Sequence, residues 1–426
     1  MKTMRRGVLA LAAGSLLAGA AAMAQDKPES LTILAHRVHQ TVSTQGAGGD
    51  ITEAWQKANG VGVNWVTMET GPLHERLFRE LALPETSIDL AFVVNTRAVD
   101  GLAKVLDPIG PYQAKAPIED MDDIFPGLVT AMTFGGELYG VPFRHASTCF
   151  HYNERMLKER GVEPPRTMEE LQEAAHKLTY KDAEGNQVHG FVIMGDNYAN
   201  IVDIARAWDG DFITLDYKMG VTGEGMTKAA TMLHEFYDSG VLPKNWAAIK
   251  TEEVNTWLQT GRAAMTTTSC GRAQIYNDPA KSKEAGNFKT VALPMSAEYK
   301  DKFPVAPAKV EFWSIVIPKN SRHKDLAWSL AREMLSKEST LKAALNGNGP
   351  VRASTYDTPE MKQKLAYADA EKAVLLVGRV PLPAFDNAAK AGDIFVEEMQ
   401  AAVLGMKPVP DALSEIERRV QPLLPK

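Results

Sequence analysis

The sequence contains only two cysteines, Cys149 and Cys270, among 426 residues. A bacterial lipoprotein carries a cysteine directly after its signal sequence, and none stands near the amino terminus here. We therefore expect no lipid anchor. The two thiols either form one disulfide, which export to an oxidising compartment would permit, or stay buried and reduced. The sequence alone leaves both alternatives open.

Basic charge, membrane-spanning runs and enzyme motifs are also scarce. The chain has 47 basic against 53 acidic residues, a formal net charge of −6, which argues against nucleic acid as a partner. No apolar run beyond the amino-terminal one is long enough to cross a bilayer. G-x-S-x-G and H-E-x-x-H are absent, and the S-x-x-K match at Ser339–Lys342 lacks its partner motifs. A secreted carbohydrate-active enzyme is kept only as the alternative from another class.

The amino terminus has the three parts of a secretory signal peptide. Lys2, Arg5 and Arg6 precede a small apolar run, and Ala22-Met23-Ala24 fits the A-x-A cleavage pattern. The general secretory route fits better than twin-arginine export, whose pattern is only partly matched. We predict a signal peptide over residues 1–24, cleaved after Ala24, and a mature protein in the periplasm.

The first part of the mature chain alternates strands and helices. Apolar strands are predicted at Leu31–Ala35, Val61–Met68 and Ile88–Val94, separated by helices that begin near Asp50 and Pro72. This order is typical of a parallel sheet, in which ligands bind at the carboxyl ends of the strands. The side chains that follow two of these strands are His36 and His39 after the first, and Asn95 and Arg97 after the third.

A second α/β unit begins after Gly136. Thr148–Tyr152 has the pattern of a strand, and Thr167 with Glu170 forms a capping box before an amphipathic helix. Phe191–Met194 is the next predicted strand. No Pro/Ser-rich linker separates the two units, so we expect ordered hinge strands between them.

Several short motifs resemble one known family. They are the run Gly136–Asn153, the break at Pro164–Thr167, the strand start at Gly261–Met265, the turn at Asn348–Arg352, and Val403–Gly405 near the carboxyl terminus. Each is weak alone, but together they cover nearly the whole mature chain in order. They resemble the extracellular solute-binding proteins of ABC importers, in the carbohydrate-binding family that includes maltose-binding protein.

The resemblance implies an α/β fold of the periplasmic binding protein type II-like class, with two α/β lobes joined by hinge strands. The expected N-terminal lobe is 25–144 plus about 313–360, and the expected C-terminal lobe is 145–312 plus about 361–426. The hinges are expected near Arg144–Ser147, Glu311–Ser314 and Pro359–Lys364.

By position and by this resemblance we select ligand-binding candidates on the cleft. These are His36, His39, Asn95, Arg97, Arg144, His145, Asp196, Tyr198, Trp208, Arg272, Trp313, Arg352 and Phe385. For Trp208, Trp313 and Phe385, packing in the hydrophobic core is an equally good explanation. His36-x-x-His39 lacks the further ligands that a zinc site needs, so no metal and no cofactor is expected.

At Arg272 this chain differs from many members of the family that it resembles. Ser269-Cys270-Gly271-Arg272 stands where many members of the family have a tryptophan that stacks on a sugar ring. A guanidinium fork suits carboxylate, phosphate or sulfonate groups. An anionic solute, such as a sugar acid, sugar phosphate or sulfonate, is therefore the alternative to a neutral sugar.

We predict a periplasmic substrate-binding receptor of an ABC importer. It would bind a carbohydrate or a related polar, hydroxylated solute by hinge closure. Its partners would be the small-molecule ligand and the permease subunits in the inner membrane, with the receptor itself a monomer. An adhesion module is the third alternative, and it predicts no small-molecule cleft.

Overall fold

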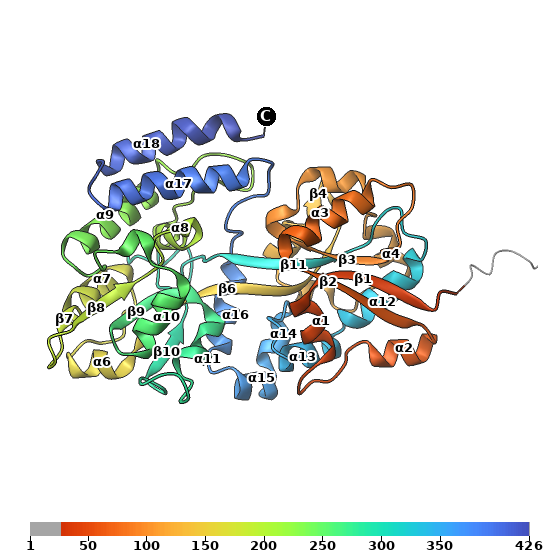
Figure 1. Cartoon of the computed structure of the whole chain (residues 1–426), viewed down its shortest axis with the longest axis horizontal. Helices are drawn as coiled ribbons and strands as arrows, with labels where there is room; N and C mark the ends of the chain where they lie inside the picture. The colour runs from red at the N-terminus through yellow and green to blue at the C-terminus, as the bar shows by residue number, and fades with distance from the viewer. Residues whose placement is uncertain (1–26, 426) are drawn as a thin grey trace, which may run out of the picture.

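The structure is a computed structural model that describes residues 27–425. The predicted signal peptide therefore lies outside the described residues. The chain forms two lobes joined by long strands (Figure 1), and each lobe has its own large hydrophobic core. The mixed α/β architecture agrees with the predicted fold class. No helix in the described part of the chain is long and apolar enough to cross a membrane.

Within residues 27–425, nine strands join in one mixed sheet that runs through both lobes. The order is β2-β1-β3-β11-β6-β9-β8-β7, with β10 also paired to β6. The strands are β1 (Ser30–His36), β2 (Gly62–Met68), β3 (Leu90–Val94), β6 (Val141–Asn153), β7 (Tyr180–Lys181), β8 (Gln187–Val192), β9 (Ala263–Ser269), β10 (Phe288–Val291) and β11 (Val310–Val316), beside a hairpin of β4 (Thr133–Phe134) and β5 (Glu137–Leu138).

The predicted parallel unit is present in the first lobe. β1 lies between β2 and β3 and runs parallel to both. Leu31, Ile33 and Leu34 of β1 and every residue of β3 are buried, because helices cover both faces of this part of the sheet. The carboxyl ends of β1 and β3 therefore meet at one edge, which faces the second lobe.

Helices surround the sheet in both lobes (Figure 1). Those of the first lobe are α1 (Arg37–Thr44), α2 (Glu53–Asn59), α3 (Thr70–Leu81), α4 (Gly110–Lys115), α5 (Pro126–Thr130), α12 (Lys324–Met334), α13 (Lys337–Leu345), α14 (Ala353–Asp357), α15 (Pro359–Lys364) and α16 (Ala368–Val377). Those of the second are α6 (Glu154–Glu159), α7 (Met168–Lys177), α8 (Tyr198–Arg206), α9 (Glu224–Asp238), α10 (Thr251–Gln259), α11 (Ala273–Tyr276), α17 (Ala388–Val403) and α18 (Val409–Val420).

Strand β6 is the principal connection between the lobes. Its first part pairs with β11, ending at Ser147↔Val310, and its second part pairs with β9, beginning at Thr148↔Ser269. One continuous strand therefore belongs to both halves of the sheet. This crossing falls where the sequence placed its first hinge, Arg144–Ser147.

The chain returns between the cores at two further places. Ala306 packs in the second core and Ala308 in the first, so this crossing lies a few residues before the predicted Glu311–Ser314. The chain passes from the first core to the second for the last time between Leu375 and Leu382. This crossing lies later in the sequence than the predicted Pro359–Lys364.

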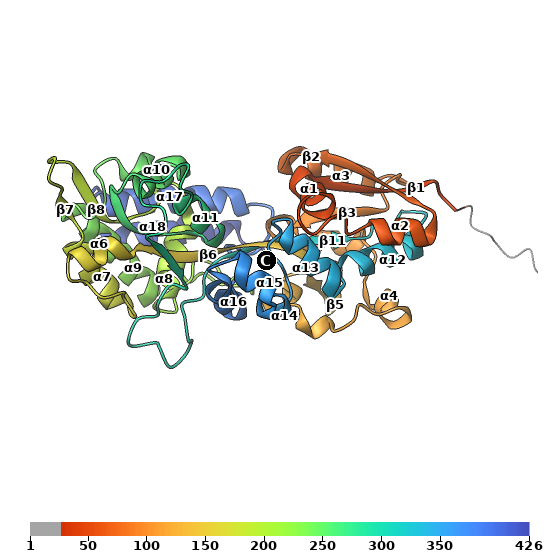
Figure 2. The ribbon, with the colours of Figure 1, turned by 90° about the horizontal axis from the view of Figure 1, so that it is seen from below.

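The reason for this shift is the packing of α14, α15 and α16. Met361, Leu365 and Val374 bury their side chains in the first core, although residues 361–426 were expected in the C-terminal lobe. Figure 2 shows these short helices beneath β6, at the middle of the molecule. They therefore lie directly beside the hinge.

Candidate functional site: the cleft between the lobes

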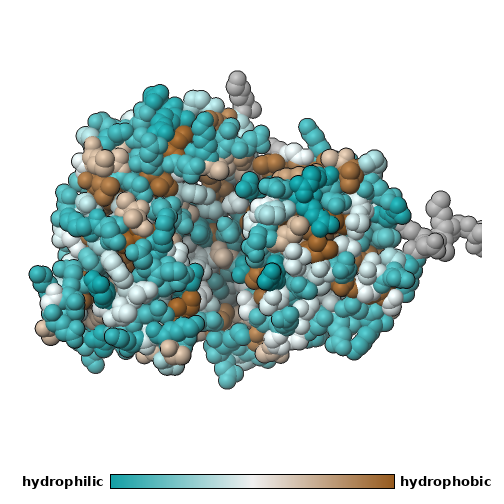
Figure 3. All heavy atoms as spheres, viewed as in Figure 1, coloured by the Kyte–Doolittle hydropathy of each residue, from teal (hydrophilic) through white to brown (hydrophobic). Residues whose placement is uncertain are grey.

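A cleft separates the two lobes. The space-filling view shows a deep hollow between them (Figure 3). A cavity of about 410 Å³ lies between side chains of both lobes and the crossing strands. Its lining residues are Phe78, Thr96, Arg97, Val99, Tyr198, Glu311, Leu382, Pro383, Phe385, Asp386, Ala388 and Ala389.

The first lobe contributes the residues that follow β3. Thr96 and Arg97 form a short 3-10 turn at the carboxyl end of this strand and line the cavity. Asn95 turns the other way: its Oδ1 accepts a hydrogen bond of 3.0 Å from the Phe312 amide, and it lines a neighbouring cavity of about 250 Å³. The sheet edge thus supplies the polar groups that the strand-end rule predicts.

The second lobe contributes Tyr198 and the residues before α17. Tyr198 is the first residue of α8, whose N-cap Asn197 accepts a hydrogen bond of 3.0 Å from the Ala199 amide. Burial, followed by the nearby Glu311 carboxylate, raises the pKa of Tyr198 to about 12. Its hydroxyl therefore stays protonated and can both donate and accept a hydrogen bond. Phe385 and Asp386 line the cavity beside it.

The crossing strands carry two residues of opposite charge, Glu311, which lines this cavity, and Arg144, which does not. Glu311 of β11 pairs with Ala146 of β6, and Trp313 pairs with Arg144. Because side chains alternate along a strand, Glu311 and Arg144 project from the same face of the sheet. Burial lowers the pKa of Arg144, and the Glu311 and Glu371 carboxylates oppose that shift. Among residues 27–425, the buried Nε of Arg144 has no hydrogen-bond partner.

Arg144 also lines a smaller cavity of about 160 Å³ at the hinge. The end of β9 contributes Ser269 to this cavity and the turn after it contributes Gly271, while the 345–371 region contributes Gly347, Lys364 and Tyr367. Arg272 is half-buried in that turn, as part of the short helix Cys270–Arg272. Glu311 thus lines the larger cavity and Arg144 the smaller one.

The disulfide between Cys149 and Cys270 is present. The two sulfur atoms are 2.04 Å apart and both side chains are fully buried. Cys149 lies on β6, just after the crossing, and Cys270 directly follows β9. The bond therefore fastens the cleft loop Ser269–Arg272 to the hinge strand.

Four of the predicted ligand-binding residues lie in the interior. His39 stacks on Phe92 at 4.2 Å between ring centroids and is fully buried. Trp208 packs in the second core and Trp313 in the first. For both residues, packing in the hydrophobic core was the other explanation of the sequence. Arg352 is fully buried and donates to the carbonyls of Glu119, Asp120 and Leu335, so it does not reach the cleft.

Three further candidates have partners of their own. His36 is the N-cap of α1, where its Nδ1 accepts from the Val38 amide at 3.2 Å, and its Nε2 lies 3.2 Å from Glu69. Asp196 pairs with Lys250. His145 is buried, and its Nε2 lies 2.7 Å from the Tyr356 hydroxyl.

Glu311 is the functional candidate that the sequence selection missed. The structure brings Arg97, Tyr198 and Phe385 together around it. A signal was available, since Glu311 is an acidic residue at the start of an otherwise apolar strand. A carboxylate tolerated at such a position must reach solvent or a partner.

No metal centre is visible in the described part of the chain: no group of three His, Cys, Asp or Glu side chains there could hold an ion. Burial first, and then the nearby Arg144 and His36, hold the pKa of His39 well below its usual value. The His39 ring stacks on Phe92 in the first core.

Two lobes, three chain crossings and an open cavity between the lobes are the arrangement of a two-lobed binding protein. Residues 50–369 match the family described as bacterial extracellular solute-binding protein, and the chain belongs to that family. Its members are binding proteins.

Individual relatives have different ligands in their names. The mannitol-binding protein of Pseudomonas aeruginosa is 23% identical over 70% of this chain and 68% of its own length. A protein of Sinorhizobium fredii, named as a probable amino-acid ABC transporter periplasmic-binding protein, is 23% identical over 94% of this chain and 92% of its own length.

Among solved structures, the sugar-binding protein MalE of Xanthomonas citri superposes with a TM-score of 0.76 at 22% identity, covering 92% of this chain and 96% of its own. A solute-binding protein of Agrobacterium vitis with bound D-mannitol gives a TM-score of 0.66 at 20% identity, covering 93% and 100%. At such identities the structures establish the fold, and the ligand has to be argued from the site.

Proposed function

We propose that this protein is the periplasmic substrate-binding receptor of an ABC importer and that it binds a sugar or polyol. The observation that carries the proposal is the cavity of about 410 Å³ whose walls come from both lobes. A solute in this position contacts Thr96 and Arg97 on one lobe and Tyr198 and Asp386 on the other. It would therefore stabilise a closed arrangement of the lobes.

The polar groups of the cleft suit a neutral, hydroxylated solute. Arg97 donates hydrogen bonds, Glu311 and Asp386 accept them, and Thr96 and Tyr198 do both. A hydroxyl group needs both kinds of partner, whereas an anion is repelled by the two carboxylates. This charge pattern favours a sugar or polyol over the anionic solute suggested by Arg272.

The relatives support the same class of solute. One is named for mannitol and another for arabinooligosaccharide, and solved structures of the same fold hold D-mannitol, ribitol and maltose. The aromatic faces at this cavity, Phe78, Tyr198 and Phe385, provide apolar contact for the carbon backbone of such a molecule.

The remaining parts of the proposal follow from the family. Export with cleavage after Ala24 would deliver a monomeric receptor to the periplasm, where it passes its solute to the permease subunits. We propose hinge motion at the crossings near Ser147, Lys309 and Arg379, which hold the two cores together. The proposal includes no catalytic step.

A thermal-stability screen of the mature protein tests the function. Binding to the folded state raises the melting temperature. Polyols and neutral sugars are expected to raise it, while sugar acids, sugar phosphates and sulfonates have no effect, and no bound compound is turned over. Stabilisation by the anions alone would contradict the proposed solute class, and turnover would favour the enzyme alternative.

A further inference from the structure

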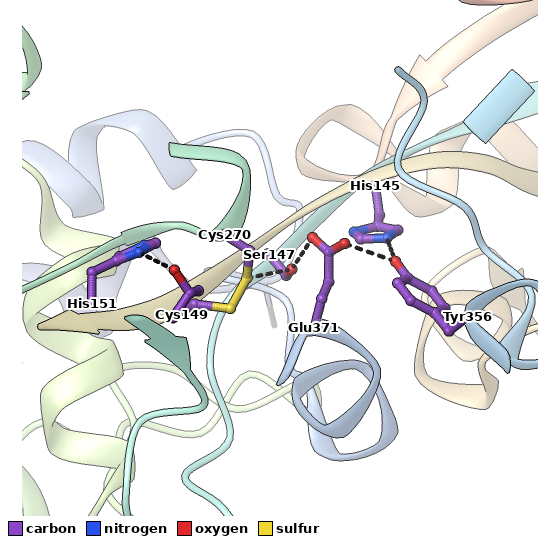
Figure 4. Close-up of a disulfide and its surroundings, with 8 residues drawn as sticks. His145, Ser147, Cys149, His151, Cys270, Tyr356 and Glu371 are labelled. Atoms are coloured by element: carbon purple, nitrogen blue, oxygen red, sulfur yellow. Dashed lines mark hydrogen bonds between the residues drawn. A yellow bond between two sulfur atoms is a disulfide. The ribbon is translucent and has the colours of Figure 1, made fainter. Parts of the chain in front are cut away.

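A chain of buried polar side chains lies at the point where β6 changes partner (Figure 4). The Ser147 hydroxyl donates to Oε1 of Glu371 over 3.0 Å, and the Tyr356 hydroxyl lies 3.0 Å from Oε2. His145 Nε2 is 2.7 Å from the same tyrosine oxygen. We call His145, Ser147, Tyr356 and Glu371 the hinge network; none of them is more than 6% exposed.

The hinge network connects elements that would move during lobe closure. His145 and Ser147 belong to the crossing strand, whereas Tyr356 and Glu371 belong to α14 and α16 of the first core. The Ser147 oxygen is also 3.3 Å from Sγ of Cys270, in the disulfide that fastens the cleft loop. Glu371 is thus linked to both the hinge and the loop.

The network has two consistent arrangements of protons. The tyrosine hydroxyl has one proton and two close neighbours, so one neighbour must donate to it. If Glu371 is ionised, Tyr356 donates to the carboxylate and the His145 ring donates to Tyr356. If Glu371 is protonated, it donates to Tyr356, which donates to His145. Both arrangements keep the hydrogen bonds along the chain; in the second, the neutral His145 ring carries its proton on the buried Nδ1, which has no hydrogen-bond partner among residues 27–425.

Both protonation states of Glu371 occur near neutral pH. Burial raises the pKa of this carboxyl to about 7, against hydrogen bonds from Tyr356 and Ser147 and the charge of Arg144. His145 stays neutral, because burial lowers its pKa to about 3. The other ionisable side chains facing the same small cavity are Tyr367 and Lys364, and Lys364 donates to the Leu345 carbonyl.

Arg144 joins this network to the cleft. The charges of Glu371 and of Glu311, which lines the solute cavity, both act on the pKa of its guanidinium, although Arg144 forms no ion pair within 4.0 Å with either carboxylate. Arg144 and Glu371 line the same 160 Å³ cavity. The guanidinium therefore lies within electrostatic reach of two carboxylates, and the one that shares its cavity is Glu371.

We propose that Glu371 is a positioning residue for solute binding: its ionised form holds Arg144 toward the hinge, and its protonated form releases Arg144 toward Glu311 and the bound solute. The inference rests on the proposed function. A solute that engages Arg144 draws it away from Glu371 and so raises the pKa of that carboxyl. Binding then takes up a proton, and affinity increases as the pH falls from 8 to 6.

Calorimetric titration with D-mannitol at pH 6 and pH 8 tests the proposal. The unaltered protein should bind roughly three- to tenfold more tightly at pH 6, since a pKa change of one unit corresponds to tenfold. Glu371→Gln replaces the carboxyl group by an amide of similar shape that is always neutral. This variant should bind D-mannitol with the same affinity at both pH values. Asp369→Asn, which alters an exposed carboxylate of the same helix, should retain the pH dependence. A Glu371→Gln protein with the original pH dependence would overturn the proposal.

A second measurement needs no solute. The carboxyl carbon of Glu371 is followed by ¹³C NMR during a pH titration of the full mature chain and of Arg144→Gln. Loss of the guanidinium should raise the midpoint of the Glu371 titration, and an unchanged midpoint would overturn the coupling. If the protein ignores D-mannitol at every pH, the proposed solute fails for this probe, while the NMR result still decides the role of Arg144.

Discussion

Glu311 of the crossing strand β11 and Tyr198 at the start of α8 line the same cavity from different parts of the molecule. The charge of the carboxylate adds to the effect of burial in raising the pKa of the phenol. A solute hydroxyl placed between them would donate to Glu311 and accept from Tyr198. This pair is therefore the best point at which to test the site by substitution.

Glu311→Gln should weaken solute binding without unfolding the protein. A hydrogen bond to a charged group is worth about 1.5–3 kcal/mol, so the dissociation constant should rise roughly 10- to 100-fold. Tyr198→Phe, which removes only the hydroxyl, should have a smaller effect. Calorimetry measures both constants. Lys228, which pairs with Glu224 and Glu298 and does not line the cavity, gives the control Lys228→Gln with unchanged affinity.

Arg352→Ala should affect stability and leave affinity unchanged. Arg352 satisfies three buried carbonyl groups and pairs with Asp123 inside the first lobe. Removing one partner of such a buried arrangement costs about 3–5 kcal/mol. Denaturant unfolding should show that loss, whereas the exposed Arg332→Ala on the nearby α12 should change stability little. An Arg352→Ala protein of unchanged stability but weakened solute binding would contradict this result and indicate that Arg352 contacts the solute in the cleft.

Replacing both cysteines by alanine should lower the free energy of unfolding. The disulfide closes a loop with a sequence separation of 121, and loss of such a bond typically costs about 2–5 kcal/mol. Thermal unfolding of the oxidised protein, the reduced protein and the double variant measures the effect. Reduction should reproduce the double variant, and equal melting temperatures for all three would show that the bond contributes no stability.

His151 should account for part of the loss of stability in acid. Burial lowers its pKa to about 4, and its Nδ1 lies 2.8 Å from the Thr290 hydroxyl. Between pH 6.5 and 4 the unfolded chain binds a proton at this position and the folded protein does not. The free energy of unfolding therefore decreases as the pH is lowered through this range. His151→Gln should remove roughly 1–3 kcal/mol of that fall. His176→Gln, at a partly exposed ring, is the matched control for the loss of one imidazole.

The sequence predicted the architecture well where local patterns decide it. Gly60 ends α2 with the positive φ that favours glycine, and Thr167 caps α7, as its predicted capping box indicates. The expected place of residues 361–377 in the C-terminal lobe was wrong, because long-range contacts of Met361 and Leu365 place this part of the chain in the first core. Short helices without a strong apolar face carry no such information in their sequence.

Some of the candidate site residues were selected correctly as cavity-lining residues, and others were not. The strand-end rule selected Arg97, and the family resemblance selected Tyr198; both line the cavity. The same rule misplaced His39, because a ring one turn into α1 points back onto Phe92. Trp313 shows the general limit: an aromatic residue in an apolar strand fits the core and the cleft equally well, and only the register of β11 with β3 decides.

The most direct test of solute binding between the lobes is calorimetric titration of the mature protein with D-mannitol, ribitol and maltose, repeated with Glu311→Gln. The account predicts saturable 1:1 binding of at least one of these uncharged compounds, weakened at least tenfold by the substitution. Binding that is unaffected by Glu311→Gln, or binding of anionic solutes alone, would contradict it.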